Sequence, residues 1–336
     1  MLNKLKLTTA LVGAATLVSG ASFAETKVKG DIEQVFNTVS RDKADDQING
    51  ARGFSNETNI GLHGTKDLDI GATLKYGFVL EDGTSDAEYT TLDFANGFSV
   101  SVAEDSGANL GSTVIPYVSD NFETVATSTG VTSYKEDGTG LSGSPHESAH
   151  ISFGFKADQG AFTYRYAPSG DSKTGDNSNI ATADDGGSEQ EIMFSGSLGI
   201  EGAKVIVGQY TIEQADDATA GDEQKFTRYG ASYNFGNITV GAERTKADTG
   251  ATSAGAEVET DKFGISFSPS DSVSLGIFTF DADKDGEAND EEGQMIQAGY
   301  NLGGLGLEFS FAQVENAGNT SGKDADIFQI RTRQKF

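Results

Sequence analysis

The chain reads Ile70-Gly-Ala72-Thr-Leu74-Lys-Tyr76-Gly-Phe78-Val-Leu80, with apolar residues at even positions and mostly small or polar residues at odd positions. A β-strand sends successive side chains to opposite faces, so this pattern gives one apolar and one polar face. The same alternation returns at 162–166, 263–267, 273–277 and 305–311. After residue 24 no stretch has a convincing amphipathic helix pattern. The sequence therefore predicts an all-β protein.

Tight turns and long polar segments alternate along the chain. Asn96-Gly97 is the strongest turn signal, because Asn-Gly favours a two-residue hairpin. The other expected tight turns are Lys66-Asp67, Asp158-Gln-Gly160, Glu201-Gly202, Gly236-Asn237, Pro269-Ser-Asp-Ser272 and Gly303-Gly304. The polar segments, rich in Asp, Gly, Ser, Thr and Asn, lie near 41–53, 82–87, 106–147, 168–188, 215–222, 248–256, 282–291 and 317–323.

These connections predict a transmembrane antiparallel β-barrel. A strand at about 27–39, two strands for each tight turn and a last strand at about 325–336 give about 16 strands. Barrels of the outer membrane join their strands by short periplasmic turns and long outer loops. A closed barrel is a single unit, because opening it would expose unpaired strand edges to lipid.

The N-terminal residues predict a cleavable signal peptide. Lys4 and Lys6 precede an uncharged stretch from Leu7 to Ser22, and Ser22-Phe23-Ala24 supplies small residues at the positions that a signal peptidase reads. The stretch is shorter than the ~20 apolar residues of a spanning helix. We expect residues 1–24 to be removed after Ala24 and residues 25–336 to form the barrel domain.

Composition narrows the class of protein. The 51 acidic and 24 basic residues give a formal net charge of −27, which disfavours binding to nucleic acid. The chain has no cysteine, so stability must come from its core or its membrane. A hydrophobic content of 36% fits either disorder or a barrel with a polar interior, and the 21 Phe and 10 Tyr weigh against disorder.

Three passages resemble the general bacterial porin family. Ser55–Leu68 is similar to that family's second strand and first turn, and Tyr229–Gly236 is similar to a later hairpin. The terminal aromatic residue Phe336 resembles the signal that the barrel-assembly machinery reads. The resemblance implies a 16-stranded, usually trimeric pore in outer-membrane lipid and lipopolysaccharide, passing small hydrophilic solutes and ions by diffusion. It also implies that the third long segment, 106–147, folds into the lumen.

The chain offers little for catalysis, and we expect it not to be an enzyme. His63, His146 and His150 are its only histidines, and loop or rim positions explain them better than a metal site. Two alternatives to a diffusion pore stay open: a channel selective for a sugar or peptide, and a surface barrel or adhesin without transport. Phe278 and Phe280 are the one obvious pair of inward aromatics.

One acidic segment matches the D-x-D-x-D-G-x5-E calcium-loop pattern. Its candidate ligands are Asp281, Asp283, Asp285, Glu287 and Glu292. The flanking residues have strand patterns, whereas the helix-loop-helix calcium motif needs helices. We expect no cofactor and a solvated outer loop here, with a weakly bound Ca²⁺ as the alternative.

Strand periodicity also predicts the charges of the lumen. The residues expected to point inward form a basic wall: Lys75, Arg165, Arg331, Arg333 and Lys335. The in-folded segment would oppose this wall with Asp120 and Glu123, producing a transverse field at a constriction. Dense acidic residues in the outer segments would concentrate cations at the entrance, so we expect moderate cation selectivity.

Overall fold

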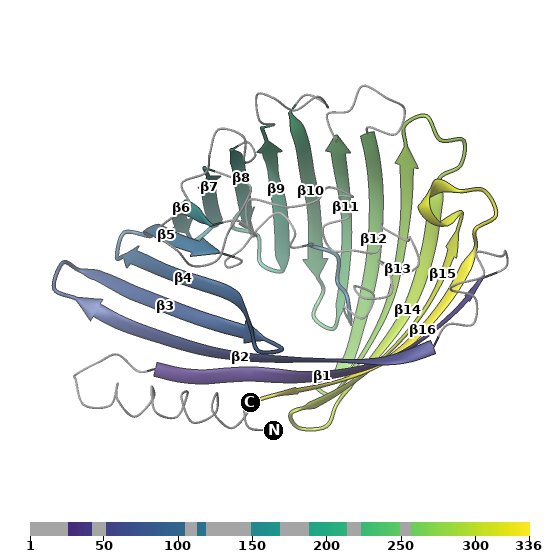
Figure 1. Cartoon of the computed structure of the whole chain (residues 1–336), viewed down its shortest axis with the longest axis horizontal. Helices are drawn as coiled ribbons and strands as arrows, with labels where there is room; N and C mark the ends of the chain where they lie inside the picture. The colour runs from purple at the N-terminus through teal and green to yellow at the C-terminus, as the bar shows by residue number, and fades with distance from the viewer. Residues whose placement is uncertain are drawn as a thin grey trace.

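The computed structural model describes residues 26–41, 52–104, 113–118, 149–168, 188–213, 223–248 and 257–336. Within these residues sixteen antiparallel strands form one closed barrel (Figure 1). The strands are β1 (Thr26–Arg41), β2 (Arg52–Leu68), β3 (Ala72–Glu81), β4 (Thr84–Phe94), β5 (Phe98–Glu104), β6 (His150–Ala157), β7 (Gly160–Ala167), β8 (Glu189–Gly196), β9 (Ala203–Ile212), β10 (Gln224–Asn234), β11 (Ile238–Asp248), β12 (Glu257–Ser270), β13 (Val273–Lys284), β14 (Glu291–Asn301), β15 (Leu305–Glu315) and β16 (Ala325–Lys335). The predicted fold class is confirmed.

The barrel closes where β16 pairs with β1. Asp31 lies opposite Lys335 in the register of this seam. Gly30 and Phe336 extend the pairing, because the Gly30 N–H donates to the Phe336 carbonyl at 3.0 Å and the Phe336 N–H donates back at 2.9 Å. Closure leaves no unpaired strand edge, which is the condition for placing a β-sheet in hydrocarbon.

The one helical element among the described residues is short. In the part of the chain that the structure describes, a 3-10 turn, η1 (Ala317–Asn319), lies between β15 and β16. No helix of these residues has the length and hydropathy to cross a bilayer.

One rim carries the tight turns that the sequence predicts. Gly97, Gly236 and Gly303 have φ values of 85°, 93° and 75°, a left-handed conformation that glycine adopts without a Cβ clash. One boundary differs from the prediction: β2 continues through Leu68, so the first turn lies at 69–71 and not at Lys66-Asp67.

The expectation of a long polar segment at 82–87 is wrong. Asp82 and Gly83 alone form the turn, with φ of 47° and 87°, and β4 begins at Thr84. Positive φ at both central residues is the geometry of the tight type I′ hairpin turn, which Asp-Gly favours. The Asp82 carboxylate also accepts a hydrogen bond from the Thr58 N–H at 3.0 Å. The polar residues after the turn belong to β4.

Alternate residues separate the two faces of the wall. One face exposes large apolar side chains on most of the strands, which is the band expected to meet lipid. They include Ile32, Val102, Phe153, Phe155, Phe162, Ile192, Val207, Tyr229, Phe263, Ile277, Ile296 and Phe311. The residues of opposite parity are small, polar or buried, and they form the inner wall.

Candidate functional site: the barrel interior

Part of the longest outer segment lies inside the barrel. The Thr113 hydroxyl and the Val114 N–H both donate to the Glu243 carboxylate on β11, at 2.9 Å and 3.1 Å. At the other end the Val118 N–H donates to the Gln297 side-chain oxygen on β14 at 3.0 Å. The expected folding of this segment into the lumen is therefore confirmed for residues 113–118. Asp120 and Glu123, the predicted acidic group, lie outside the described residues.

Residues 113–118 pack into two apolar clusters. Ile115 and Tyr117 pack on the inner side of β13, where the Tyr117 and Phe278 rings lie 5.0 Å apart. Val114 packs in a second cluster with Phe226 and Tyr210. Phe278 and Phe280 are buried beneath the segment at 2% and 4% exposure, so they support it and do not present rings to a passing solute.

The loop before β16 also contributes to the inner packing. Ala317 joins the cluster around Phe278. The Gly318 N–H donates to Glu291 at 2.5 Å, and the Asn319 amide donates to the Ala282 carbonyl at 2.8 Å. This loop is therefore anchored to the outer ends of β13 and β14.

The predicted basic wall is matched by carboxylates. Lys75 forms an ion pair with Asp93 on β4, and both side chains remain partly exposed. Arg165 forms an ion pair with Glu191 on β8, and both are buried. Burial keeps Arg165 from touching water in an open lumen, whereas Lys75 is 47% exposed on the inner wall.

Arg331 and Arg333 occupy a charged network at the seam. Arg331 contacts Glu33 at 3.2 Å and Glu308 at 2.7 Å. Arg333 contacts the same Glu33 at 2.7 Å and also Asp31 at 3.1 Å. Lys335 lies exposed at the end of β16. Sequence reasoning missed these carboxylates, although the alternation that turns Arg331 inward also turns Glu33 and Glu308 inward.

The wall opposite residues 113–118 carries polar side chains. Strands β2–β6 lie eight places from β10–β14 in the ring. His63 and Tyr89 share a hydrogen bond of 3.1 Å, and the Thr91 and Ser101 hydroxyls share one of 2.8 Å. Inner-wall side chains exposed to solvent in this half of the barrel include Lys27, Lys29, Thr65 and Lys75. Polar groups that are accessible inside a closed barrel indicate a water-filled lumen.

The calcium pattern is split between a strand and a turn. β13 runs through Lys284, so Asp281 and Asp283 project from its outer face, and Asp281 lies opposite Glu292. Asp285 and Glu287 belong to the following turn. Within the described ranges, no three His, Asp or Glu side chains are grouped so that they could hold a metal ion. A solvated loop stays the prediction of the sequence, with weak calcium binding as its alternative.

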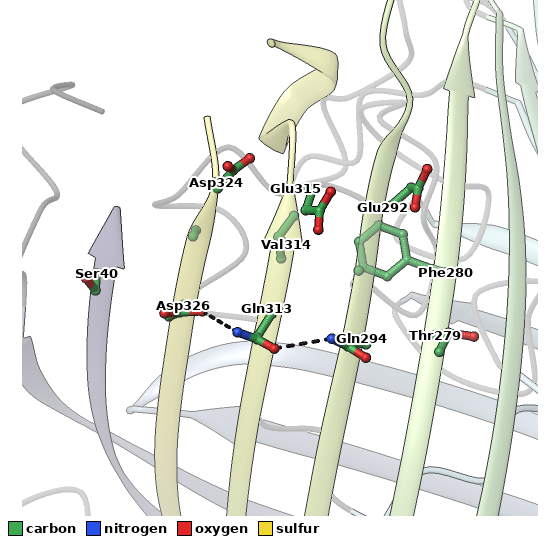
Figure 2. A pocket seen from close by; sticks show the side chains of 12 residues that line it. Ser40, Thr279, Phe280, Glu292, Gln294, Gln313, Val314, Glu315, Asp324 and Asp326 are labelled. Carbon is green, nitrogen blue, oxygen red and sulfur yellow. Dashed lines mark hydrogen bonds between the residues drawn. The ribbon is translucent and has the colours of Figure 1, made fainter. Parts of the chain in front are cut away.

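A hollow of about 490 Å³ lies near the outer ends of β13–β16 (Figure 2). The Gln294 amide donates to Gln313 at 3.2 Å, and the Gln313 amide donates to Asp326 at 3.1 Å. Glu292, Glu315 and Asp324 lie beyond this row, toward the outer rim (Figure 2). These polar residues have outward parity, whereas Phe280, Gly293, Val314 and Ala325, which also line the hollow, have inward parity.

The chain resembles known proteins both in sequence family and in fold. A family model described as Gram-negative porin matches residues 8–268. The anion-selective porin from Comamonas acidovorans is 17% identical, with a TM-score of 0.65 over 93% of this chain and 100% of that chain. A Salmonella typhi OmpF complex with daunomycin is 12% identical, with a TM-score of 0.64 over 93% and 98%. A triple mutant of Rhodopseudomonas blastica porin is 15% identical, with a TM-score of 0.59 over 93% and 100%. No curated protein sequence matches the chain.

Proposed function

The chain belongs to the Gram-negative porin family, and we propose that it passes small hydrophilic solutes by passive diffusion without a dedicated solute site. Members of this family are non-enzymatic channels of the outer membrane. The observation that carries the proposal is the inner wall of β2–β6, where charged and hydroxyl side chains reach solvent inside the closed ring. Residues 113–118 press against the opposite wall, which favours a narrowed lumen over a sealed one.

Solute size tests the absence of a dedicated site. Purified protein in liposomes is challenged with a graded series of sugars, and the swelling rates are recorded. A diffusion pore gives rates that fall smoothly with solute size. A strong preference for one sugar over others of equal size would favour a substrate-selective channel. No swelling with any sugar would favour a surface barrel without transport.

The interior argues against a selective aromatic path. Phe278 and Phe280 are the inward aromatics that the sequence singles out, and residues 113–118 cover them. On the opposite wall, the His63 and Tyr89 rings form another inward pair, with centroids 6.1 Å apart. A single pair of rings is too little for a continuous binding track, so non-specific diffusion is the better account.

Cation selectivity is the finer part of the proposal. The arginines expected to form a basic wall are each bonded to carboxylates, which lowers their net effect on passing ions. The chain carries 51 acidic and 24 basic residues. The Comamonas acidovorans protein is anion-selective, but at 17% identity it supports only the fold. Trimer formation and recognition of Phe336 by the assembly machinery stay proposals from the sequence resemblance.

A further inference from the structure

Five glycines lie on the inner wall beneath residues 113–118. Each comes from a different strand of the run β10–β14, and each has inward parity. They are Gly230, Gly241, Gly264, Gly276 and Gly299, here called the glycine seat. The seat crosses the wall below the segment that narrows the barrel.

The segment touches the seat so closely that side chains there would collide with it. A Cβ added at Gly264 would lie 2.6 Å from Ile115 Cγ2, and one at Gly276 would lie 2.8 Å from Val118 Cγ2. At Gly241 the added atom would lie 2.9 Å from Pro116 Cδ. Carbon atoms in contact prefer about 3.5–4.0 Å, so even one methyl group requires the segment or its contacting side chain to shift by about 1 Å.

The segment is tied at both ends, which fixes the direction of such a movement. Glu243 holds Thr113 and Val114, and Gln297 holds Val118. The wall under the seat is hydrogen-bonded to strands on both sides, so it yields less than the segment. An obstacle between the two would therefore push the middle of the segment toward the barrel axis.

We propose that the glycine seat determines the bore of this channel by setting how far residues 113–118 stand from the wall. The inference rests on the proposed function, because it assumes that ions and solutes pass beside the segment. Gly264 and Gly276 have no positive φ, and the only atoms closer than 3.0 Å to an added Cβ at these positions belong to residues 113–118. They act as positioning residues through the segment and need not touch the solute.

Single-channel conductance in planar bilayers tests the seat. Gly264→Ala and Gly276→Ala should each lower the conductance by a measurable fraction, the double variant should lower it further, and the largest permeant sugar should become smaller. Gly306→Ala is the matched control, because this inner-wall glycine of β15 has no atom nearer than 3.5 Å to an added Cβ. It should conduct like the wild type. A folded barrel is verified for every variant by migration on gels before and after heating.

Releasing residues 113–118 from the wall should have the opposite effect on the conductance. Gln297→Ala removes the acceptor of the Val118 N–H and should raise both conductance and sugar cutoff. In that background Gly276→Ala should have less effect than in the wild type, because Val118 is free to leave the seat. The proposal is overturned if folded Gly264→Ala and Gly276→Ala conduct like the wild type, or if Gly306→Ala narrows the channel equally. A wild type that forms no channel would instead contradict the proposed function.

Discussion

Arg331 and Arg333 join β16 to strands on both sides. Glu33 comes from β1 and contacts both guanidinium groups, while Glu308 comes from β15 and contacts Arg331. The alternation along β16 was enough to predict from the sequence that both arginines point inward. Their partners are close in space and distant in sequence, up to the 298 residues between Glu33 and Arg331, so the pattern of one strand could not reveal the pairing.

Removing Arg331 should weaken the seam. Its side chain is 7% exposed, and the change Arg331→Met takes the counter-charge from Glu308 and one of two from Glu33. Removing one partner of a buried ion pair costs about 3–5 kcal/mol, because the other charge stays buried. The free energy of unfolding in urea, measured on protein in lipid vesicles, should fall by about this amount.

Lys75→Met supplies the comparison for this prediction. Lys75 and Asp93 are 47% and 35% exposed, so water screens the pair. Exposed ion pairs contribute about 0–1 kcal/mol. Equal losses for Arg331→Met and Lys75→Met would mean that burial of the seam network adds nothing to its stability.

At the scale of elements, the β3–β4 turn shows where composition misleads. Residues 82–87 are glycine or polar except for Ala87, and such a composition alone does not distinguish a loop from the end of a strand. The Asp82-Gly83 pair carried the correct signal, since Asp-Gly favours the type I′ turn that the structure has. Backbone geometry at two residues therefore decides the element better than the composition of six.

Gly83→Ala should destabilise this hairpin. Gly83 has φ of 87°, where a residue with a Cβ is strained by roughly 1–2 kcal/mol. Gly83→Asn should lower the free energy of unfolding by less than Gly83→Ala, because asparagine tolerates the left-handed region. Gly53→Ala is a control on β2, where an added Cβ has nothing within 4 Å. In urea unfolding, the loss of stability should be largest for Gly83→Ala, smaller for Gly83→Asn and smallest for Gly53→Ala. If Gly53→Ala lowers the free energy of unfolding as much as Gly83→Ala, backbone strain is excluded as the cause.

The calcium pattern gives a prediction for β13 and its turn. Asp281 and Asp283 lie two residues apart on a strand, so their Cβ atoms are separated by about 6.5–7 Å and project in parallel. The ligands of one Ca²⁺ must converge to about 2.3–2.6 Å from the ion. We expect calorimetric titration with Ca²⁺ to release no saturable heat. A binding heat in the wild type that Asp283→Ala abolishes would show instead that the strand end rearranges around calcium.

For the whole molecule, the sequence was sufficient to predict the ring of strands but not the packing inside it. Alternation and turn spacing gave sixteen antiparallel strands, because every strand of a closed barrel repeats the same local pattern. The glycine seat was not predictable in this way. Gly264 and Gly276 look like ordinary small residues of a polar face, and only contact with residues 113–118, far away in the chain, gives them a role.

Ion selectivity is a property of the whole molecule, because it depends on the summed charges of the inner wall, the constriction and the channel entrance. The inner arginines at the seam and on β7 are bonded to carboxylates, so they present less positive charge to the lumen than their number suggests. We expect the acidic excess of the chain to set the sign of the potential at the entrance. Such a potential acts over a Debye length of about 8–10 Å at 0.10–0.15 M salt.

A salt gradient across a planar bilayer should therefore give a reversal potential of cation-selective sign at low ionic strength, and the value should shrink as salt is raised. Asp120→Asn combined with Glu123→Gln should reduce it further if the segment that contains them lines the constriction. Asp283→Asn, which removes one carboxylate from the outer face of β13, is the matched control and should have a smaller effect. An anion-selective potential at low salt would show that Lys27, Lys29 and Lys75 on the open wall outweigh the acidic mouth.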